Sequence, residues 1–86
     1  MNIDNDRVRV TTWTFEPGDR TGTHQHELPY VVIPVTGGRL RIESTEGANA
    51  STQAPGEPYF RDAGAQHDVI NEGTAQLVFV EVELKN

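Results

Sequence analysis

Short runs of strand-forming residues, separated by turn residues, fill this chain and leave no segment with a helical period. Residues 7–15 are rich in valine, threonine and aromatic side chains, and residues 66–71 and 75–84 repeat this character after turns. Seven or eight such strands in 86 residues predict an all-β sandwich or barrel. We expect residues 1–86 to form a single domain, because a chain of this length supports one hydrophobic core.

The first of these runs changes its apolar face part-way along. Val8 and Val10 have one parity, whereas Trp13 and Phe15 have the other. A β-bulge at positions 11–12 explains the change, and so does a strand that is covered on both faces.

Three further segments give local predictions. Gly37 and Gly38 predict a tight hairpin turn, since glycine accepts the positive φ angles of such turns. Residues 45–53 are polar and irregular, which is typical of a mobile loop. Glu81 and Glu83, near the end of the last strand, are interpreted as part of a solvent-facing side.

Two strands are apolar without alternation, at residues 31–33 and 77–80. Such runs indicate that both faces are covered, and one barrel has only one inside. We therefore expect a homodimer whose interface covers the outer face of one or both strands. The alternative is that these strands lie between two sheets of a single barrel.

The charge balance restricts the partners. Thirteen acidic and seven basic side chains give a net charge of −6, which argues against nucleic acid and anionic membrane surfaces. No run approaches the roughly 20 apolar residues of a membrane span. The chain has no cysteine, so disulfides and thiol catalysis are excluded, and its polar, acidic start favours a cytoplasmic location.

Two histidines separated by one residue, His24 and His26, fall in an extended segment. On a strand their side chains share one face and lie about 6–7 Å apart along it. Two imidazoles so placed can bind one metal ion at nitrogen–metal distances of about 2.0–2.2 Å.

The spacing around these histidines resembles the two motifs of the cupin family. From Gly18 the order is five residues, His-Gln-His, three residues, Tyr30, six residues and a glycine. From Gly56 it is five residues, Asp-Ala-Gly, two residues, His67, three residues and Asn71. The resemblance covers well over half of the chain. It implies a cupin-type β-barrel (a double-stranded β-helix or jelly roll) and a divalent metal ion held by His24, His26 and His67.

Two positions depart from the family pattern. Asp62 replaces a proline, a mild change because aspartate also starts turns. Tyr30 replaces the family's glutamate ligand, and a phenol with a pKa near 10 is a poor metal ligand at neutral pH. The fourth protein ligand is therefore left open. We predict that Tyr30 is a catalytic residue that donates a hydrogen bond to a bound oxygen or substrate; packing in the barrel mouth is the alternative.

The function expected from this resemblance is that of a small metal-dependent enzyme acting on a small polar metabolite, by dioxygenase-like or isomerase/lyase chemistry. Imidazole ligands suit iron, zinc, nickel, manganese or copper, so the ligand set leaves the metal open. Three arginines are candidates to anchor an anionic substrate: Arg39, Arg41 and Arg61. The stretch 24–37 is also similar to small single-domain cupins associated with β-alanine degradation. The alternative is a non-catalytic barrel that binds or senses a small ligand around a structural metal.

Overall fold

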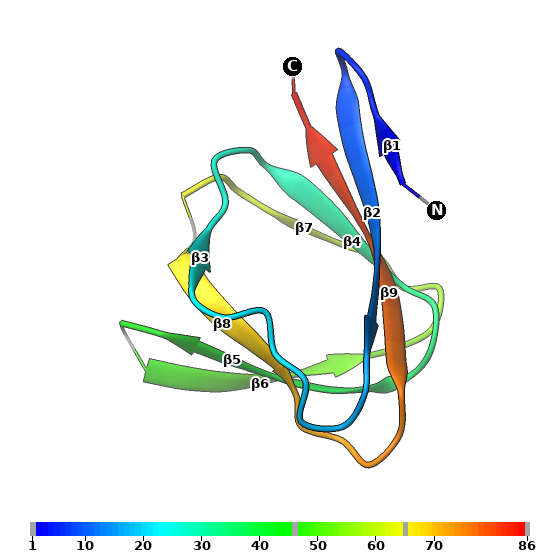
Figure 1. The fold of residues 1–86 in the computed structure, drawn as a ribbon, viewed down its shortest axis with the longest axis vertical. Helices are drawn as coiled ribbons and strands as arrows, with labels where there is room; N and C mark the ends of the chain where they lie inside the picture. Colours follow the sequence, from blue (N-terminus) through cyan, green and yellow to red (C-terminus); the bar gives the residue numbers. More distant parts are fainter. Residues whose placement is uncertain (1, 46, 65, 86) are drawn as a thin grey trace.

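The computed structural model describes residues 2–45, 47–64 and 66–85, and these form two β-sheets that face each other (Figure 1). The order of strands is β1–β2–β9–β4–β7 in the five-stranded sheet and β3–β8–β5–β6 in the four-stranded sheet. The bounds of the nine strands are β1 Ile3–Asp4, β2 Val8–Phe15, β3 His24–Gln25, β4 Tyr30–Pro34, β5 Gly38–Ser44, β6 Gly47–Gln53, β7 Tyr59–Arg61, β8 Gln66–Asn71 and β9 Leu77–Leu84. The architecture is the predicted all-β jelly roll.

The hydrophobic core lies between the two sheets and takes side chains from both. Its buried members are Phe15, Tyr30, Val32, Leu40, Val69, Leu77 and Phe79. Two aromatic pairs meet edge to face, Trp13 with Phe15 at 5.8 Å and Phe15 with Phe79 at 5.7 Å between ring centroids. The alternation of buried and outward residues along β4 and β9 supplies this packing, since successive side chains of a strand point to opposite faces.

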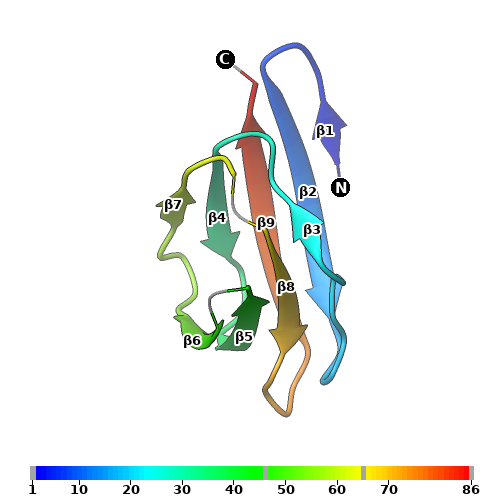
Figure 2. The same ribbon diagram turned by 90° about the vertical axis from the view of Figure 1, so that its left-hand side faces the viewer.

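Of the two explanations offered for the change of apolar face in the first long strand, the bulge is absent and cover on both faces is present. β2 pairs with β9 residue for residue, from Val8 opposite Leu84 to Phe15 opposite Leu77, and the two strands run side by side in Figure 2. Residues of both parities are half-buried over positions 10–13. Partial cover on both faces of β2 therefore accounts for the change of apolar face.

The predicted hairpin at Gly37 and Gly38 is wrong. β4 belongs to the five-stranded sheet and β5 to the four-stranded sheet, so these glycines carry the chain from one sheet to the other. Gly38 is needed for a close approach: a Cβ there would lie 2.6 Å from Cδ1 of the fully buried Leu77.

The predicted mobile loop at residues 45–53 is also wrong over 47–53, while position 46 lies outside the described residues. β6 occupies these positions and pairs with β5 along its whole length. An edge strand needs backbone partners but no continuous apolar face, so its polar side chains remain exposed. The exception is Gln53, which is buried and whose amide donates hydrogen bonds to Ser51 Oγ and Tyr59 Oη.

Other local predictions are confirmed. The turn at 16–19 closes with a hydrogen bond from the Asp19 amide to the Glu16 carbonyl, and β8 has the predicted bounds 66–71. Across the described part of the chain, no helix has the length and apolar character needed to cross a membrane.

Candidate metal centre

The first motif segment runs antiparallel along β8, which belongs to the second motif. The Gly18 amide donates to the Asn71 carbonyl at 2.9 Å and the Thr21 amide to the Val69 carbonyl at 3.0 Å. Near the end of this ladder His24 lies directly opposite His67, and Gln25 lies opposite Gln66. Residues far apart in the sequence are thus placed side by side, with the predicted ligands at one end of the ladder.

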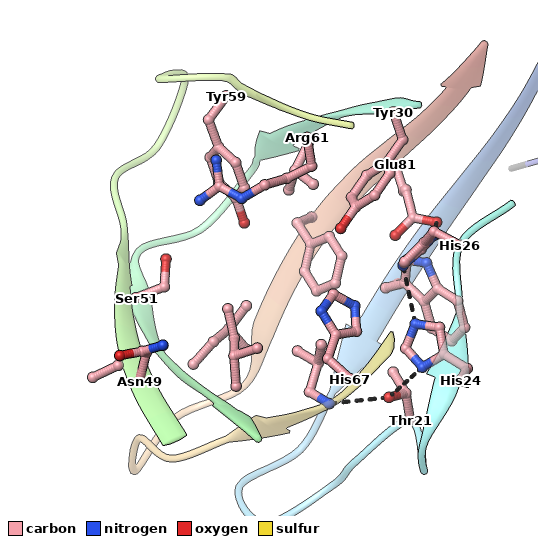
Figure 3. A pocket seen from close by; sticks show the side chains of 17 residues that line it. Thr21, His24, His26, Tyr30, Asn49, Ser51, Tyr59, Arg61, His67 and Glu81 are labelled. Atoms are coloured by element: carbon pink, nitrogen blue, oxygen red, sulfur yellow. Dashed lines mark hydrogen bonds and ion pairs between the residues drawn. The ribbon is translucent and has the colours of Figure 1, made fainter. Parts of the chain in front are cut away.

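The structure brings the three predicted ligands together (Figure 3). The ring centroids of His24, His26 and His67 are 4.7, 4.8 and 5.1 Å apart, and the ring planes meet at 69–80°. One nitrogen from each ring lies within 4.8 Å of the other two. The three rings are therefore close enough for one nitrogen from each to approach a common ion.

The spacing of one nitrogen pair is compatible with a shared metal ion. Nε2 of His24 and Nε2 of His26 are 3.0 Å apart. Two nitrogens bound at right angles to one ion, each at about 2.1 Å, are separated by about 3.0 Å. The donor set of three imidazoles suits first-row transition metals.

The other ring nitrogen of His24 fixes its tautomer. Nδ1 lies 3.0 Å from the Gly22 carbonyl oxygen. A carbonyl oxygen only accepts hydrogen bonds, so Nδ1 carries the proton and Nε2 keeps the lone pair that a metal requires. Thr21 Oγ1 also donates to this carbonyl at 2.8 Å and accepts from the Val69 amide at 3.1 Å, which ties the turn to β8.

Two of the histidines are held neutral. Burial, followed by the neighbouring His24 and His67, lowers the pKa of His26 from 6.5 to about 4. Burial, followed by His24, also lowers the pKa of His67. Neutral imidazoles are the form that binds metals, so neither ring must lose a charge first.

Tyr30 packs flat against His26. The ring centroids are 4.0 Å apart, the planes differ by 24°, and the tyrosine is only 3% exposed. Burial raises the pKa of Tyr30 to about 12, so its hydroxyl remains a proton donor. The predicted catalytic residue is therefore at the site both as packing for a ligand ring and with its hydroxyl directed into the cavity (Figure 3).

The interpretation of Glu81 as solvent-facing is wrong. It alternates with the buried Leu77 and Phe79 along β9, so it points inward and is only 8% exposed. Its Oε1 lies 4.0 Å from Nδ1 of His26. Burial, followed by the nearby Glu83, raises the pKa of Glu81 from 4.5 to about 7. Glu83 is half-buried and lies 3.7 Å from Nη1 of Arg9.

The histidines line a cavity of about 350 Å³ whose walls come from both sheets (Figure 3). Most of its lining is apolar, including Val32, Leu40 and Phe79. The indole Nε1 of Trp13, which also lines it, is buried and lacks a hydrogen-bond partner within the described ranges. The cavity is therefore adjacent to the candidate ligands.

Of the three candidate arginines, the structure places one at the cavity. Arg61 lines it, with its guanidinium 4.6 Å from the centroid of the Tyr59 ring. Arg39 pairs instead with Glu72, and Arg41 with Glu43, at exposed positions.

A buried aspartate on the outer side of the ladder supports the site indirectly. Asp68 accepts hydrogen bonds from Nε and Nη2 of Arg20 and from the Gly22 amide, the latter at 3.1 Å. The Arg20 guanidinium lowers the pKa of Asp68. The bond to Gly22 holds the turn whose carbonyl orients His24.

This chain is similar to known proteins in sequence and in fold. The family model for the cupin domain matches residues 11–83. The beta-alanine degradation protein BauB of Pseudomonas aeruginosa is 46% identical over 85 residues, covering 99% of this chain and 90% of that protein. The crystal structure of a cupin domain from Bordetella pertussis superposes with a TM-score of 0.95 at 48% identity, over 98% of this chain and 88% of that one. The polyketide cyclase RemF of Streptomyces resistomycificus shares the fold alone, with a TM-score of 0.74, 21% identity and coverage of 95% and 57%.

Proposed function

This chain belongs to the cupin domain family, and from that premise we propose that it is a metal-dependent enzyme acting on a small polar metabolite. In this proposal residues 1–86 act as one domain, and His24, His26 and His67 hold one divalent ion of iron, zinc, nickel, manganese or copper. The observation that carries it is the convergence of three imidazoles beside a cavity of about 350 Å³. When bound, such an ion supplies Lewis acidity or activates dioxygen, which suits isomerase/lyase or dioxygenase-like chemistry.

The residues around the cavity favour an anionic or carbonyl-bearing substrate. Arg61 supplies a cation, and the hydroxyl of Tyr30 supplies a neutral donor. Because the phenol of Tyr30 stays protonated, it donates to a substrate oxygen while its ring keeps His26 in place. The similarity to BauB leads us to propose a cytoplasmic role in the breakdown of β-alanine or of a small acid derived from it.

A binding or sensing barrel is the second candidate. It is favoured by one observation: the chain has three histidines, and all three are assigned to the metal. No histidine is then left to act as a general base, which weakens hydrolytic chemistry.

Elemental analysis of the untagged protein tests the metal site. We expect about one equivalent of a transition metal in the wild type, loss of that metal in His67→Ala, and retention in Gln66→Ala, which changes the exposed neighbour. Absence of metal from the wild type, even after reconstitution, would remove the proposal. Turnover of a panel of β-alanine-related acids by the loaded protein then separates the enzyme from the binding barrel.

We also propose that two copies pair through the outer face of the five-stranded sheet. One row of directly opposed residues crosses all five strands without a charge, and it consists of Ile3, Val10, Val82, Val31 and Phe60. Ile3 and Phe60 at its ends are 47% and 51% exposed. A second apolar sheet face would cover this row, and the cavity on the inner face would remain open.

A further inference from the structure

A carboxylate lies directly behind the ring of His26. Nε2 of His26 faces the other histidines, 3.0 Å from Nε2 of His24. Nδ1, on the other side of the same ring, faces Oε1 of Glu81 at 4.0 Å. The ring of His26 thus separates the candidate metal position from the carboxylate.

This arrangement distinguishes Glu81 from a fourth ligand. The metal-binding group formed by the three histidines does not contain it. In the part of the chain that the structure describes, Glu81 instead groups with His26 and Glu83. Glu81 therefore approaches the site through His26.

His24 shows how a hydrogen-bond acceptor at Nδ1 prepares a histidine to bind a metal through Nε2. Its Nδ1 proton is held by the Gly22 carbonyl, which leaves Nε2 free to bind a metal. His26 needs the same distribution of its proton, and the acceptor that faces its Nδ1 is Glu81. Tyr30 stacks on the ring from one side and restricts its rotation. The two histidines thus use different acceptors for the same purpose, a carbonyl in one case and a carboxylate in the other.

The strand register relates this carboxylate to the unusual Tyr30. Tyr30 lies opposite Glu83, and Val32 lies opposite Glu81, so Glu81 is one inward-facing pair away from Tyr30. A tyrosine at position 30 brings no negative charge to the metal. The negative charge of a carboxylate next to Nδ1 of His26 makes this imidazole a more basic ligand. Glu81 would thus partly offset the positive charge of the metal through His26, without binding the metal itself.

We infer that Glu81 is a positioning residue that holds the proton of His26 on Nδ1 and strengthens its Nε2 as a metal ligand. The inference rests on the proposed metal site and concerns the wild-type protein with its metal bound. The 4.0 Å separation is longer than a hydrogen bond, so the inference requires the Glu81 carboxylate to move closer to Nδ1 when the metal binds. The hydrogen bond becomes stronger once Nε2 coordinates a cation.

Cobalt titration tests this inference, with Co²⁺ as the probe and chelator competition as the measure of affinity. We expect Glu81→Gln to bind Co²⁺ about 10- to 100-fold more weakly than the wild type and to shift the visible absorption bands of the ion. Glu57→Gln, the control, changes an exposed carboxylate that does not line the cavity and is expected to retain the wild-type affinity and spectrum. Glu81→Asp, which keeps the charge, is expected to recover part of the lost affinity.

The outcomes separate the two proposals. Failure of the wild type to bind Co²⁺ or Zn²⁺ removes the proposed metal site itself. Tight binding by the wild type, with the same affinity and spectrum in Glu81→Gln, overturns only the role of Glu81. The zinc-loaded wild type gives a readout that needs no variant: the Nδ1 proton of His26 is expected to exchange slowly with solvent in NMR spectra. Fast exchange of that proton would also overturn the inference.

Discussion

His24 and His67 face each other across the ladder between β3 and β8, with their ring centroids 4.8 Å apart. This pair joins the two motif segments at the candidate metal site. His26 completes the group because it follows His24 by two residues and Tyr30 holds its ring from the side.

Removing one member of this pair is expected to abolish tight metal binding. His24→Ala leaves two imidazoles, and we expect the metal affinity to fall by more than the ~100-fold upper range for loss of an outer partner. Chelator competition measures the change. Gln25→Ala alters the exposed residue between the two ligands and should bind as the wild type does. Wild-type affinity in His24→Ala would show that this ring is not a ligand.

The metal-free protein is expected to lose stability in mild acid because of His26. Its pKa falls from 6.5 to about 4 on folding. Between these values the unfolded chain takes up a proton that the folded chain does not, so the free energy of unfolding decreases as the pH falls. Urea unfolding in chelator at pH 7.5 and pH 5 should show a smaller loss for His26→Gln than for the wild type. Equal losses would contradict a neutral, buried His26.

Glu81→Gln is expected to stabilise the metal-free protein at high pH. The pKa of Glu81 rises from 4.5 to about 7 on folding, so the folded chain keeps a proton that the unfolded chain releases. Wild-type stability therefore decreases as the pH rises through this window. The variant should exceed the wild type by on the order of 1–2 kcal/mol at pH 8 and match it at pH 4. A variant that is less stable at pH 8 would refute this account of the carboxylate.

Gly38→Ala is expected to destabilise the fold by about 1–3 kcal/mol, because its methyl group would overlap the buried Leu77. Thermal unfolding measures the loss. Gly37→Ala is the matched control, since its Cβ would meet neighbours at ordinary distances of 3.6 Å or more. Equal melting temperatures for the two variants would show that Leu77 moves aside without strain.

Ile33→Glu is expected to convert the proposed dimer into a monomer. Ile33 is partly exposed on the outer face of β4, and a charge there would be buried against the second copy. Light scattering at micromolar concentration distinguishes the two states. Thr52→Glu, on the exposed face of β6, should leave the dimer intact. A wild type that is already monomeric would remove the dimer proposal.

Strand patterning was sufficient to predict an all-β fold, and the separation of His24 and His26 fixes their common face, because any strand imposes that geometry. The jelly roll and the grouping of His67 with the other two histidines followed instead from the resemblance to the cupin motifs, and the structure brings the three together. The strand that carries His67 has the bounds that the sequence indicated.

The remaining features depend on contacts between distant segments. β6 is a strand because the edge of β5 is free to pair with it. The segment at Gly38 is a crossover between sheets because β4 and β5 belong to different sheets. Glu81 was misjudged because an acidic side chain favours solvent, although its parity with Leu77 and Phe79 already pointed inward. Its proximity to His26 arises from packing between the sheets, which no local pattern encodes.

The two-residue strand β3 has a consequence for the order of events during biogenesis. The histidines of the first motif meet His67 only after the chain between them has folded and β3 has docked on β8. Such long-range pairing is late and slow compared with local turns. Before this docking the chain offers at most two neighbouring histidines, so the proposed three-histidine site exists only in the completed barrel.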